Sequence, residues 1–216
     1  MIVNNFSTLE LSEPILRNLN ELGLKEMTQI QEQSLPHILK NEDVIAQAKT
    51  GSGKTVAFGI GVLSKLVVKK FRVQSLVLCP TRELADQVAN ELRQLARTVH
   101  NVKILTLCGG VAFGPQLGSL SHHAHIIVGT PGRILKHLNK GSLNLDDLDL
   151  LVLDEADRML DMGFIDDINS ILSYTPNNRQ TLLFSATYPD EIKSLSASIQ
   201  KNLFSFKQSL MRRKIK

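Results

Sequence analysis

Short, nearly continuous apolar runs alternate along this chain with longer segments of helical period, and this alternation limits the fold more than any other feature. We expect strands at Asp43–Gln47, Ser75–Cys79, Lys103–Cys108, His125–Gly129, Asp149–Leu153 and Gln180–Ser185. Helices are expected at Ser12–Leu22, from Thr28, from Gly53 and at Arg82–Arg97, with further helical stretches between the later strands. Strands that are apolar on both faces and joined by helices form a parallel sheet. The sequence therefore predicts an α/β domain, with a mostly parallel sheet and helices on both faces.

The bulk composition is compatible with one such domain. The chain has 216 residues, of which 43% are hydrophobic, enough to fill a core. No apolar run approaches the roughly 20 residues that a membrane helix requires, so no membrane span is expected. The first six residues do not resemble a secretion signal, and we expect a cytoplasmic protein.

The net charge of +4 does not indicate a broadly basic protein. Four of the positive charges, on Arg212, Arg213, Lys214 and Lys216, lie in the last five residues, and the rest of the chain is formally neutral. Any contact with nucleic acid must therefore come from individually placed groups.

Cysteines and histidines give two further candidate sites. Cys79 and Cys108 could form a metal or redox pair, but their apolar surroundings favour buried, reduced thiols. His122, His123 and His125 cluster in sequence, although a metal site needs a defined geometry and usually a fourth ligand.

A phosphate-binding loop is predicted between the first expected strand and the helix that follows it. It consists of Ala48, Lys49, Thr50, Gly51, Ser52, Gly53, Lys54 and Thr55. Its glycines let successive backbone N–H groups face the phosphates, and the helix N-terminus adds a positive dipole end. Lys54 is expected near the β- and γ-phosphates, and the Thr55 hydroxyl is a candidate Mg²⁺ ligand. The alternative, a surface turn rich in Gly and Ser, does not account for the strand and helix on either side.

Carboxylates follow the expected strand that ends at Leu153. Asp154 comes directly after this strand, where it would hold Mg²⁺ through water, and Glu155 is the candidate to orient and deprotonate an attacking water. Carboxylates also favour helix N-termini, so an acidic helix start is the alternative. The catalytic interpretation is favoured because these acids and Lys54 belong to the same alternating pattern.

Six segments, in this order, resemble the motifs of DEAD-box RNA helicases. They are the phosphate loop, Pro80–Leu84, Gly109-Gly110, Thr130–Arg133, Asp154-Glu155-Ala156-Asp157 and Ser185–Thr187. The resemblance covers Phe6 to about Phe204 and implies a RecA-like P-loop NTPase domain over residues 1–206, with ATP and Mg²⁺ as cofactors. Residues 207–216, a basic tail, depart from the pattern. Two stretches, Val77–Val88 and Lys103–Gly110, look most like bacterial members that act in ribosome assembly.

The resemblance implies that Gln31 reads the adenine base and that Phe6 packs on it. An amide both donates and accepts hydrogen bonds, which suits the adenine edge. Gln29 stands where the family usually has Pro. Thr28 and Gln31 also form a capping box, which gives Gln31 a compatible structural role.

The resemblance further implies contacts to the RNA backbone, because backbone N–H groups and helix N-termini hold phosphates without reading bases. The residues that match are Pro80, Thr81, Arg82, Gly109, Gly110, Thr130, Pro131, Gly132 and Arg133. Outside these motifs, Arg82 and Arg133 would be interpreted as ordinary surface arginines.

A coupling role is implied for Ser185 and Thr187, whose hydroxyls could bond to Asp157 and tie the phosphate state to the RNA surface. The alternative is a polar strand end that precedes the helix expected near Pro189.

The family binds ATP between two RecA-like domains, and we expect the second domain to be absent from this chain. An arginine finger from that domain contributes about 10³–10⁵ in rate, so the chain alone is expected to bind nucleotide weakly, hydrolyse it slowly and not unwind RNA. A monomer is expected. The basic tail is compatible with an artefact, a gene truncation or an RNA-binding arm.

Three functions are compatible with these patterns. The first is half of an RNA-dependent ATPase, and the second is a binding module without turnover. The third is another P-loop ATPase such as a DNA translocase, which Gln31 and the Ser185–Thr187 motif argue against. ATP hydrolysis with an added second domain would separate the first two, and rejection of GTP would argue against the third.

Overall fold

The structure, a computed structural model, describes residues 5–200 and 203–207. These residues contain one seven-stranded sheet with the order β3-β4-β2-β5-β6-β1-β7, in which every pairing is parallel. The strands are β1 (Asp43–Gln47), β2 (Ser75–Leu78), β3 (Ile104–Leu107), β4 (Ile126–Gly129), β5 (Leu150–Leu153), β6 (Gln180–Ser185) and β7 (Leu203–Lys207). The predicted α/β class with a parallel sheet is confirmed.

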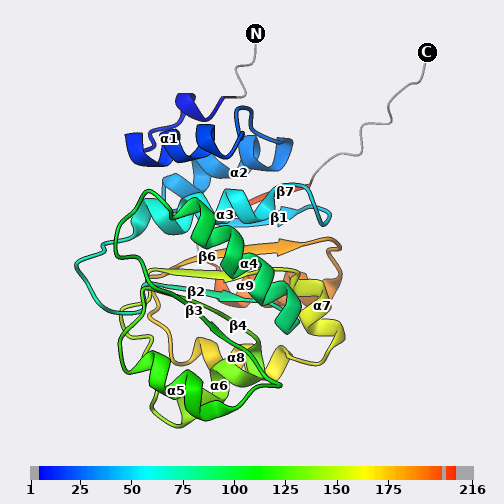
Figure 1. The fold of residues 1–216 in the computed structure, drawn as a ribbon. Helices are drawn as coiled ribbons and strands as arrows, with labels where there is room; N and C mark the ends of the chain where they lie inside the picture. The colour runs from blue at the N-terminus through cyan, green and yellow to red at the C-terminus, as the bar shows by residue number, and fades with distance from the viewer. Residues whose placement is uncertain (1–4, 201–202, 208–216) are drawn as a thin grey trace.

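Helices connect the strands and cover the sheet (Figure 1). They are η1 (Phe6–Thr8), α1 (Glu13–Glu21), α2 (Gln29–Leu39), α3 (Lys54–Lys65), α4 (Arg82–Leu95), α5 (Phe113–Leu120), α6 (Pro131–Asn139), α7 (Ala156–Asp161), α8 (Ile165–Leu172) and α9 (Asp190–Ile199). Figure 1 shows α1 and α2 at one end of the molecule and α5, α6 and α8 at the other. No helix among the described residues is long and apolar enough to cross a membrane.

Alternate residues of each strand face opposite layers of helices, as the strand period of two requires. Val44 and Ala46 of β1 lie in a cluster with buried residues of α1, α2, α3 and α4. Ile45, between them, belongs to the cluster on the other face with α6, α7, α8 and α9. Helices therefore cover both faces of the sheet, which is why strands β1 to β6 are largely apolar.

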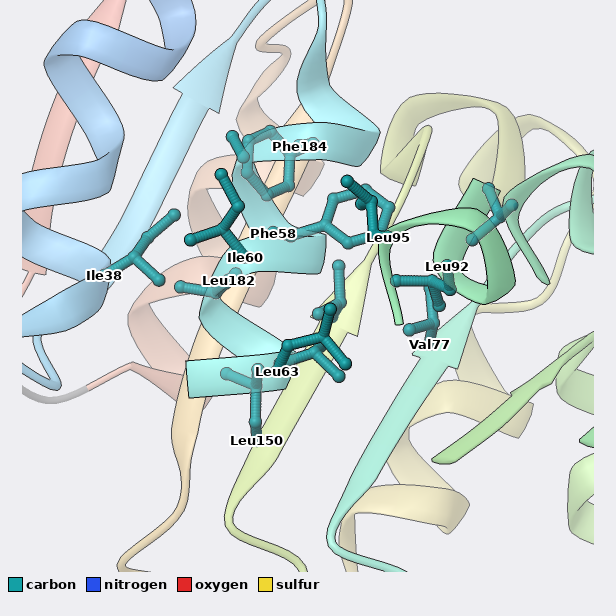
Figure 2. Packing of buried hydrophobic residues seen from close by; sticks show 14 of the residues in the cluster. Ile38, Phe58, Ile60, Leu63, Val77, Leu92, Leu95, Leu150, Leu182 and Phe184 are labelled. Carbon is teal, nitrogen blue, oxygen red and sulfur yellow. The ribbon is translucent and has the colours of Figure 1, made fainter. Parts of the chain in front are cut away.

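Helix α3 lies inside the first layer, between α2, α4 and the sheet (Figure 2). Its Phe58 ring lies 5.5 Å, between centroids, from that of Phe184 on β6. A Cβ added at Gly61 of α3 would lie 2.4 Å from Ile38 of α2, so only glycine allows α2 to approach this closely.

The six predicted strands are all present, and their bounds agree with the structure within one residue at each end. Strand β7 was not predicted, and its last residue, Lys207, falls in the segment assigned to the basic tail. The remaining tail residues, 208–216, lie outside the described residues. Ser12 is the N-cap of α1 as expected, although its side chain makes no capping hydrogen bond.

Because all strands are parallel, their carboxyl ends lie along one edge of the sheet. The segments that follow β1, β2, β3, β4, β5 and β6 hold all the motifs described above except the one around Gln31. In open α/β sheets this is the edge at which ligands bind.

Candidate functional site

The phosphate loop lies between β1 and α3, as predicted. Gly51 and Gly53 have positive φ angles of 78° and 93°, and Gly53 is the N-cap of α3. A Cβ at Gly53 would lie 2.5 Å from the side-chain nitrogen of Gln31, so this position needs glycine for both space and conformation. The loop thus brings backbone N–H groups to the N-terminus of α3, an arrangement suited to anions.

Lys54 and Asp154 form a buried pair at the centre of the site. The Lys54 Nζ lies 3.6 Å from the Asp154 Oδ1, and the side chains are 6% and 4% exposed. Neither atom has a hydrogen-bond partner in the described part of the chain, and the buried Ser52 hydroxyl has none either. Buried polar atoms are rarely left in this state unless a ligand completes them.

The pKa of Asp154 is raised to about 6, chiefly because burial disfavours the charged carboxylate. The neighbouring Glu155 also raises it, whereas Lys54 lowers it. A divalent cation would favour the charged form, and the Thr55 hydroxyl at the start of α3 is an oxygen of the kind that Mg²⁺ prefers. The Lys54 ammonium and the Asp154 carboxylate, a buried ion pair without hydrogen-bond partners in the described residues, therefore fit a phosphate bound together with a metal ion.

Glu155 is held between the phosphate loop and α7. Its backbone is left-handed, with φ 53° and ψ 51°, an uncommon conformation for a residue other than glycine. One carboxylate oxygen accepts a hydrogen bond from the Thr50 hydroxyl at 3.1 Å, and the other is 2.7 Å from Nη1 of Arg158. The candidate base is therefore oriented on both sides, by a loop residue and by a helix residue that sequence reasoning did not identify.

Gln31 links the capping box to the phosphate loop. Its oxygen accepts a hydrogen bond from the Thr28 N–H at 2.8 Å, and its nitrogen donates to the Gly53 carbonyl at 3.0 Å. The side chain is 2% exposed. The structural role of Gln31 is therefore present in the structure, and one lone pair and one N–H of the amide remain for a ligand.

Phe6 does not offer a surface for a base in this structure. Its side chain is 2% exposed and belongs to the core cluster of the first layer, beside residues of α1 and α2. The prediction that Phe6 packs on adenine is therefore not met in this arrangement. An aromatic residue near the N-terminus was assigned to the ligand, whereas its apolar ring contributes to the core.

Asp157 receives two hydrogen bonds from Thr187, one from the backbone N–H and one from the hydroxyl, each 2.9 Å long. Burial raises the pKa of Asp157, but the bonds from Thr187, with smaller contributions from the Ser185 hydroxyl and the Ala186 N–H, outweigh burial and the pKa is lowered. The Ser185 hydroxyl is itself buried. Asp157 therefore ties α7 to the end of β6, chiefly through its two hydrogen bonds with Thr187.

The residues matched to RNA contacts follow β2, β3 and β4. Thr81 caps α4, and its hydroxyl accepts a hydrogen bond from the Leu84 N–H at 3.3 Å. Thr130, the N-cap of α6, accepts one from the Gly109 N–H at 3.3 Å. Arg82 is 55% exposed, with its Nε 3.5 Å from a carboxylate oxygen of Asp86. Two helix N-termini and a glycine turn thus lie near one another at this part of the edge.

Arg133 is held by residues that sequence reasoning missed. Its guanidinium donates to the Gln116 side-chain oxygen at 2.9 Å and to the Val111 carbonyl at 2.8 Å. Gln116 is buried and also donates to the Cys108 carbonyl at 3.0 Å. Since guanidinium has five N–H donors, others stay available to a phosphate. A glutamine inside the otherwise apolar helix α5 was the only sequence signal for this contact.

His137 completes the group around Gln116. The Nε2 of His137 lies 3.1 Å from the Gln116 oxygen, which can only accept, so this nitrogen carries the proton. The ring stacks on Phe113, with centroids 4.2 Å apart. Burial, and to a smaller extent the charges of Arg133, Lys136 and Lys140, lower the pKa of His137 to about 4.

Cys79, Cys108 and His125 are buried parts of the scaffold, whereas His122 and His123 are exposed. Cys79 and Cys108 are buried and not joined in a disulfide, and burial raises the pKa of both thiols, that of Cys108 to about 11. His125 accepts a hydrogen bond from the Lys103 N–H and lies 3.0 Å from the Val68 carbonyl. No group of metal-ligating side chains with the geometry of a metal site occurs among residues 5–200 and 203–207.

Comparison with known proteins decides the family. Residues 28–195 match the model of the DEAD/DEAH box helicase family. The chain belongs to this family. Its phosphate loop, Asp154–Asp157 tetrad and Ser185–Thr187 segment thus lie in a helicase domain, at the carboxyl edge of a parallel sheet.

Individual relatives support the same placement. The chain is 59% identical over 198 residues to the ATP-dependent RNA helicase DbpA of Escherichia coli, a match that covers 91% of this chain and 43% of that protein. It is 49% identical to the DEAD-box ATP-dependent RNA helicase CshA of Geobacillus kaustophilus, covering 90% of this chain and 41% of that protein. The chain therefore spans less than half the length of these two curated relatives.

A solved structure shows the same fold. A DEAD box protein from the hyperthermophile Methanococcus jannaschii superimposes with a TM-score of 0.91 at 42% identity. The match covers 95% of this chain and 56% of the other. The resemblance to DEAD-box helicases is thus confirmed in both sequence and fold.

Proposed function

We propose that this chain is the ATP- and RNA-binding half of an ATP-dependent RNA helicase. The observation that carries the proposal is the buried pair of Lys54 and Asp154, whose facing atoms have no hydrogen-bond partner in the described residues. The pair lies beside a glycine-rich helix N-terminus, and a buried ion pair is costly unless further groups complete its hydrogen bonds. ATP with Mg²⁺ supplies complementary groups for both.

In this proposal Lys54 contacts the β- and γ-phosphates, and the loop N–H groups from Ala48 to Thr55 surround the phosphate chain. Thr55 and Asp154 would hold Mg²⁺, which when bound neutralises charge on the phosphate oxygens. Gln31 would contact adenine through the lone pair and the N–H that its two internal hydrogen bonds leave over.

Glu155 would orient the attacking water and accept its proton, since one of its oxygens is held by Thr50 of the phosphate loop and the other by Arg158 of α7. The proposal includes a second RecA-like domain that supplies an arginine finger. Such a residue is worth about 10³–10⁵ in rate. Without it, the chain is expected to bind nucleotide but to turn it over slowly.

The RNA backbone would lie over the segments after β2, β3 and β4. Thr81, Arg82, Gly109, Gly110 and the 130–133 segment offer helix N-termini, N–H groups and guanidinium donors, which bind phosphate regardless of base. The two bonds between Thr187 and Asp157 would connect this surface with the ATP site. Strand separation would require both domains.

The wider setting is also part of the proposal. DbpA and CshA are named as ATP-dependent RNA helicases. By its resemblance to bacterial members of this kind, we assign the complete protein to ribosome assembly in the cytoplasm, with ribosomal RNA as the target. We expect a monomer.

Steady-state ATP hydrolysis by the chain, with and without single-stranded RNA, tests the proposal. Binding of a fluorescent ATP analogue, absent for the GTP analogue, together with near-background hydrolysis is the expected result. Adding the second RecA-like domain should raise hydrolysis in the presence of RNA. If it does not, a binding module without turnover is the better description. RNA unwinding by the chain alone would contradict the half-enzyme proposal.

A further inference from the structure

Three cationic side chains gather on one face of α6. Arg133, Lys136 and Lys140 follow at spacings of three and four residues, which places them in one stripe about 10 Å long. All three lie near the Phe113 ring of α5, with their charged groups 5.8, 5.5 and 5.0 Å from its centroid. The structure therefore concentrates positive charge around one aromatic ring.

No carboxylate neutralises this stripe. None of the three side chains forms an ion pair in the part of the chain that the structure describes. The Asp167 carboxylate of α8 lies beside Gly132 at the beginning of α6 and pairs with none of them. The buried His137 does not add charge at neutral pH, since its pKa is about 4.

The stripe is continuous with the surface proposed to bind RNA. It begins at Arg133, the last residue of the Thr130–Arg133 motif, and leads along α6 away from the sheet edge toward Lys140, its C-cap. Lys136 and Lys140 are exposed, and each ammonium group has three donors and a compact charge, which suits phosphate oxygens.

We propose that Lys136 and Lys140 extend the RNA-binding surface along α6 and hold the phosphate backbone of the strand beyond Arg133. This inference rests on the proposed function. The Phe113 ring is not a platform for a base, because His137 is stacked on it and the cationic groups surround it. Its role is to keep the two lysines beside Arg133 through cation–π contacts. The added contacts are therefore independent of RNA sequence.

Binding of a fluorescein-labelled 12-nucleotide oligouridine, followed by fluorescence anisotropy over a series of KCl concentrations, tests the inference. The variant is the double substitution Lys136→Gln and Lys140→Gln. The matched control, Lys69→Gln with Lys70→Gln, removes the same charge from exposed lysines of the loop after α3. Arg82→Ala reports on the proposed RNA surface itself.

We expect the α6 double variant to bind the oligouridine about fivefold more weakly at low salt. The slope of log affinity against log salt should fall by about 1.4, from roughly 0.7 for each phosphate contact to a single strand. The control should stay within twofold of wild type. Melting temperatures of all variants accompany the titrations, because lysines at a helix C-terminus also stabilise the helix.

Each other outcome overturns the inference in a distinguishable way. If Arg82→Ala weakens oligouridine binding and the α6 double variant does not, the proposed function stands, but Lys136 and Lys140 are not part of the RNA-binding surface. A lower melting temperature with unchanged RNA affinity would assign the lysines to the helix end alone. Equal losses in the α6 double variant and the control would indicate a diffuse charge effect. If the wild-type chain does not bind the oligouridine, the proposed RNA function fails together with the extension.

Discussion

The phosphate loop and the surroundings of Arg133, two parts of the same sheet edge, differ in how far their polar groups are already hydrogen-bonded. Around the phosphate loop, Lys54 and Asp154 face each other with buried atoms that have no hydrogen-bond partner in the described residues. Around Arg133, by contrast, the Gln116 side chain connects two helices and a strand end through hydrogen bonds. The first part depends on a ligand to complete it, and the second is complete without one.

This difference predicts which part of the edge gains more free energy when its ligand binds. At the phosphate loop a ligand should contribute strongly, because it satisfies groups that are already desolvated. At the Arg133 cluster, defined here as Arg133, Gln116, His137 and Phe113, the protein holds its own shape and presents spare donors. Substitutions in the first part should therefore change ligand affinity, and substitutions in the second should change stability.

The largest expected effect is that of Lys54→Gln on ATP affinity. Loss of a charge-assisted contact in a buried site should weaken binding of a fluorescent ATP analogue about 100-fold. Oligouridine affinity should not change. Lys40→Gln, at the exposed C-cap of α2, is the charge-matched control and should bind the analogue like wild type. If Lys54→Gln binds the ATP analogue within threefold of wild type, the phosphate loop does not depend on a ligand in the way proposed here.

Gln116→Leu should break the Arg133 cluster without affecting the phosphate loop. The substitution removes the hydrogen bonds that Gln116 makes with the Cys108 carbonyl, Arg133 and His137, at a cost of about 3 kcal/mol in the free energy of unfolding. Urea denaturation measures this change. Gln87→Leu on the exposed face of α4 should cost less than about 0.5 kcal/mol. A loss of ATP affinity equal to the Lys54 effect would show that the two parts are not separate.

The pH dependence of stability sharpens the same contrast. The pKa of His137 is about 4 in the folded chain and about 6.5 when unfolded, so the unfolded state binds the proton first as the pH falls. The contribution of His137 is therefore complete above pH 6.5 and is lost between pH 6.5 and 4. Urea denaturation of wild type and His137→Gln over this range should give a smaller pH slope for the variant. Equal pH slopes for wild type and variant would show that His137 does not cause this pH dependence.

The smallest effect is expected for Thr187→Val, at the proposed connection between the ATP site and the RNA surface. The substitution removes the hydroxyl bond to Asp157 and keeps the backbone one, so stability should fall by about 1 kcal/mol. Nucleotide affinity and oligouridine affinity should each stay near wild type, whereas RNA stimulation of hydrolysis, measured with the second domain added, should decrease. Undiminished stimulation would place the connection elsewhere.

The parts of the fold that local patterns encode were predictable. Strands β1 to β6 are visible as largely apolar runs because helices cover both faces of the sheet, and the phosphate loop is visible because its glycines and Lys54 are adjacent in sequence. Strand β7 was missed because it follows α9 closely and carries Ser205 and Lys207 among its five residues, and the predicted domain boundary fell within it.

The Arg133 cluster could not be predicted from such patterns. Its hydrogen bonds join residues 17 and 21 positions apart on two different helices, and a single buried glutamine looks the same in sequence as an exposed one. The burial of Phe6 was not predicted for the reverse reason, since an aromatic ring fits a core as well as a base. The roles of Gln116 and Phe6 depend on partners distant in sequence, and the residue types alone do not show them.

The close approach of α2 to α3 at Gly61 has a mechanical consequence. Gln31 is tied to Gly53 at the beginning of the two helices, and Ile38 meets Gly61 about two turns further on. Helices α2 and α3 therefore run side by side in the same direction and are in close contact at two points. An adenine at Gln31 and a phosphate at Lys54 would both contact this one rigid pair of helices. Nucleotide binding would then require little rearrangement within the described domain. The large movements of the catalytic cycle would be those of the proposed second RecA-like domain.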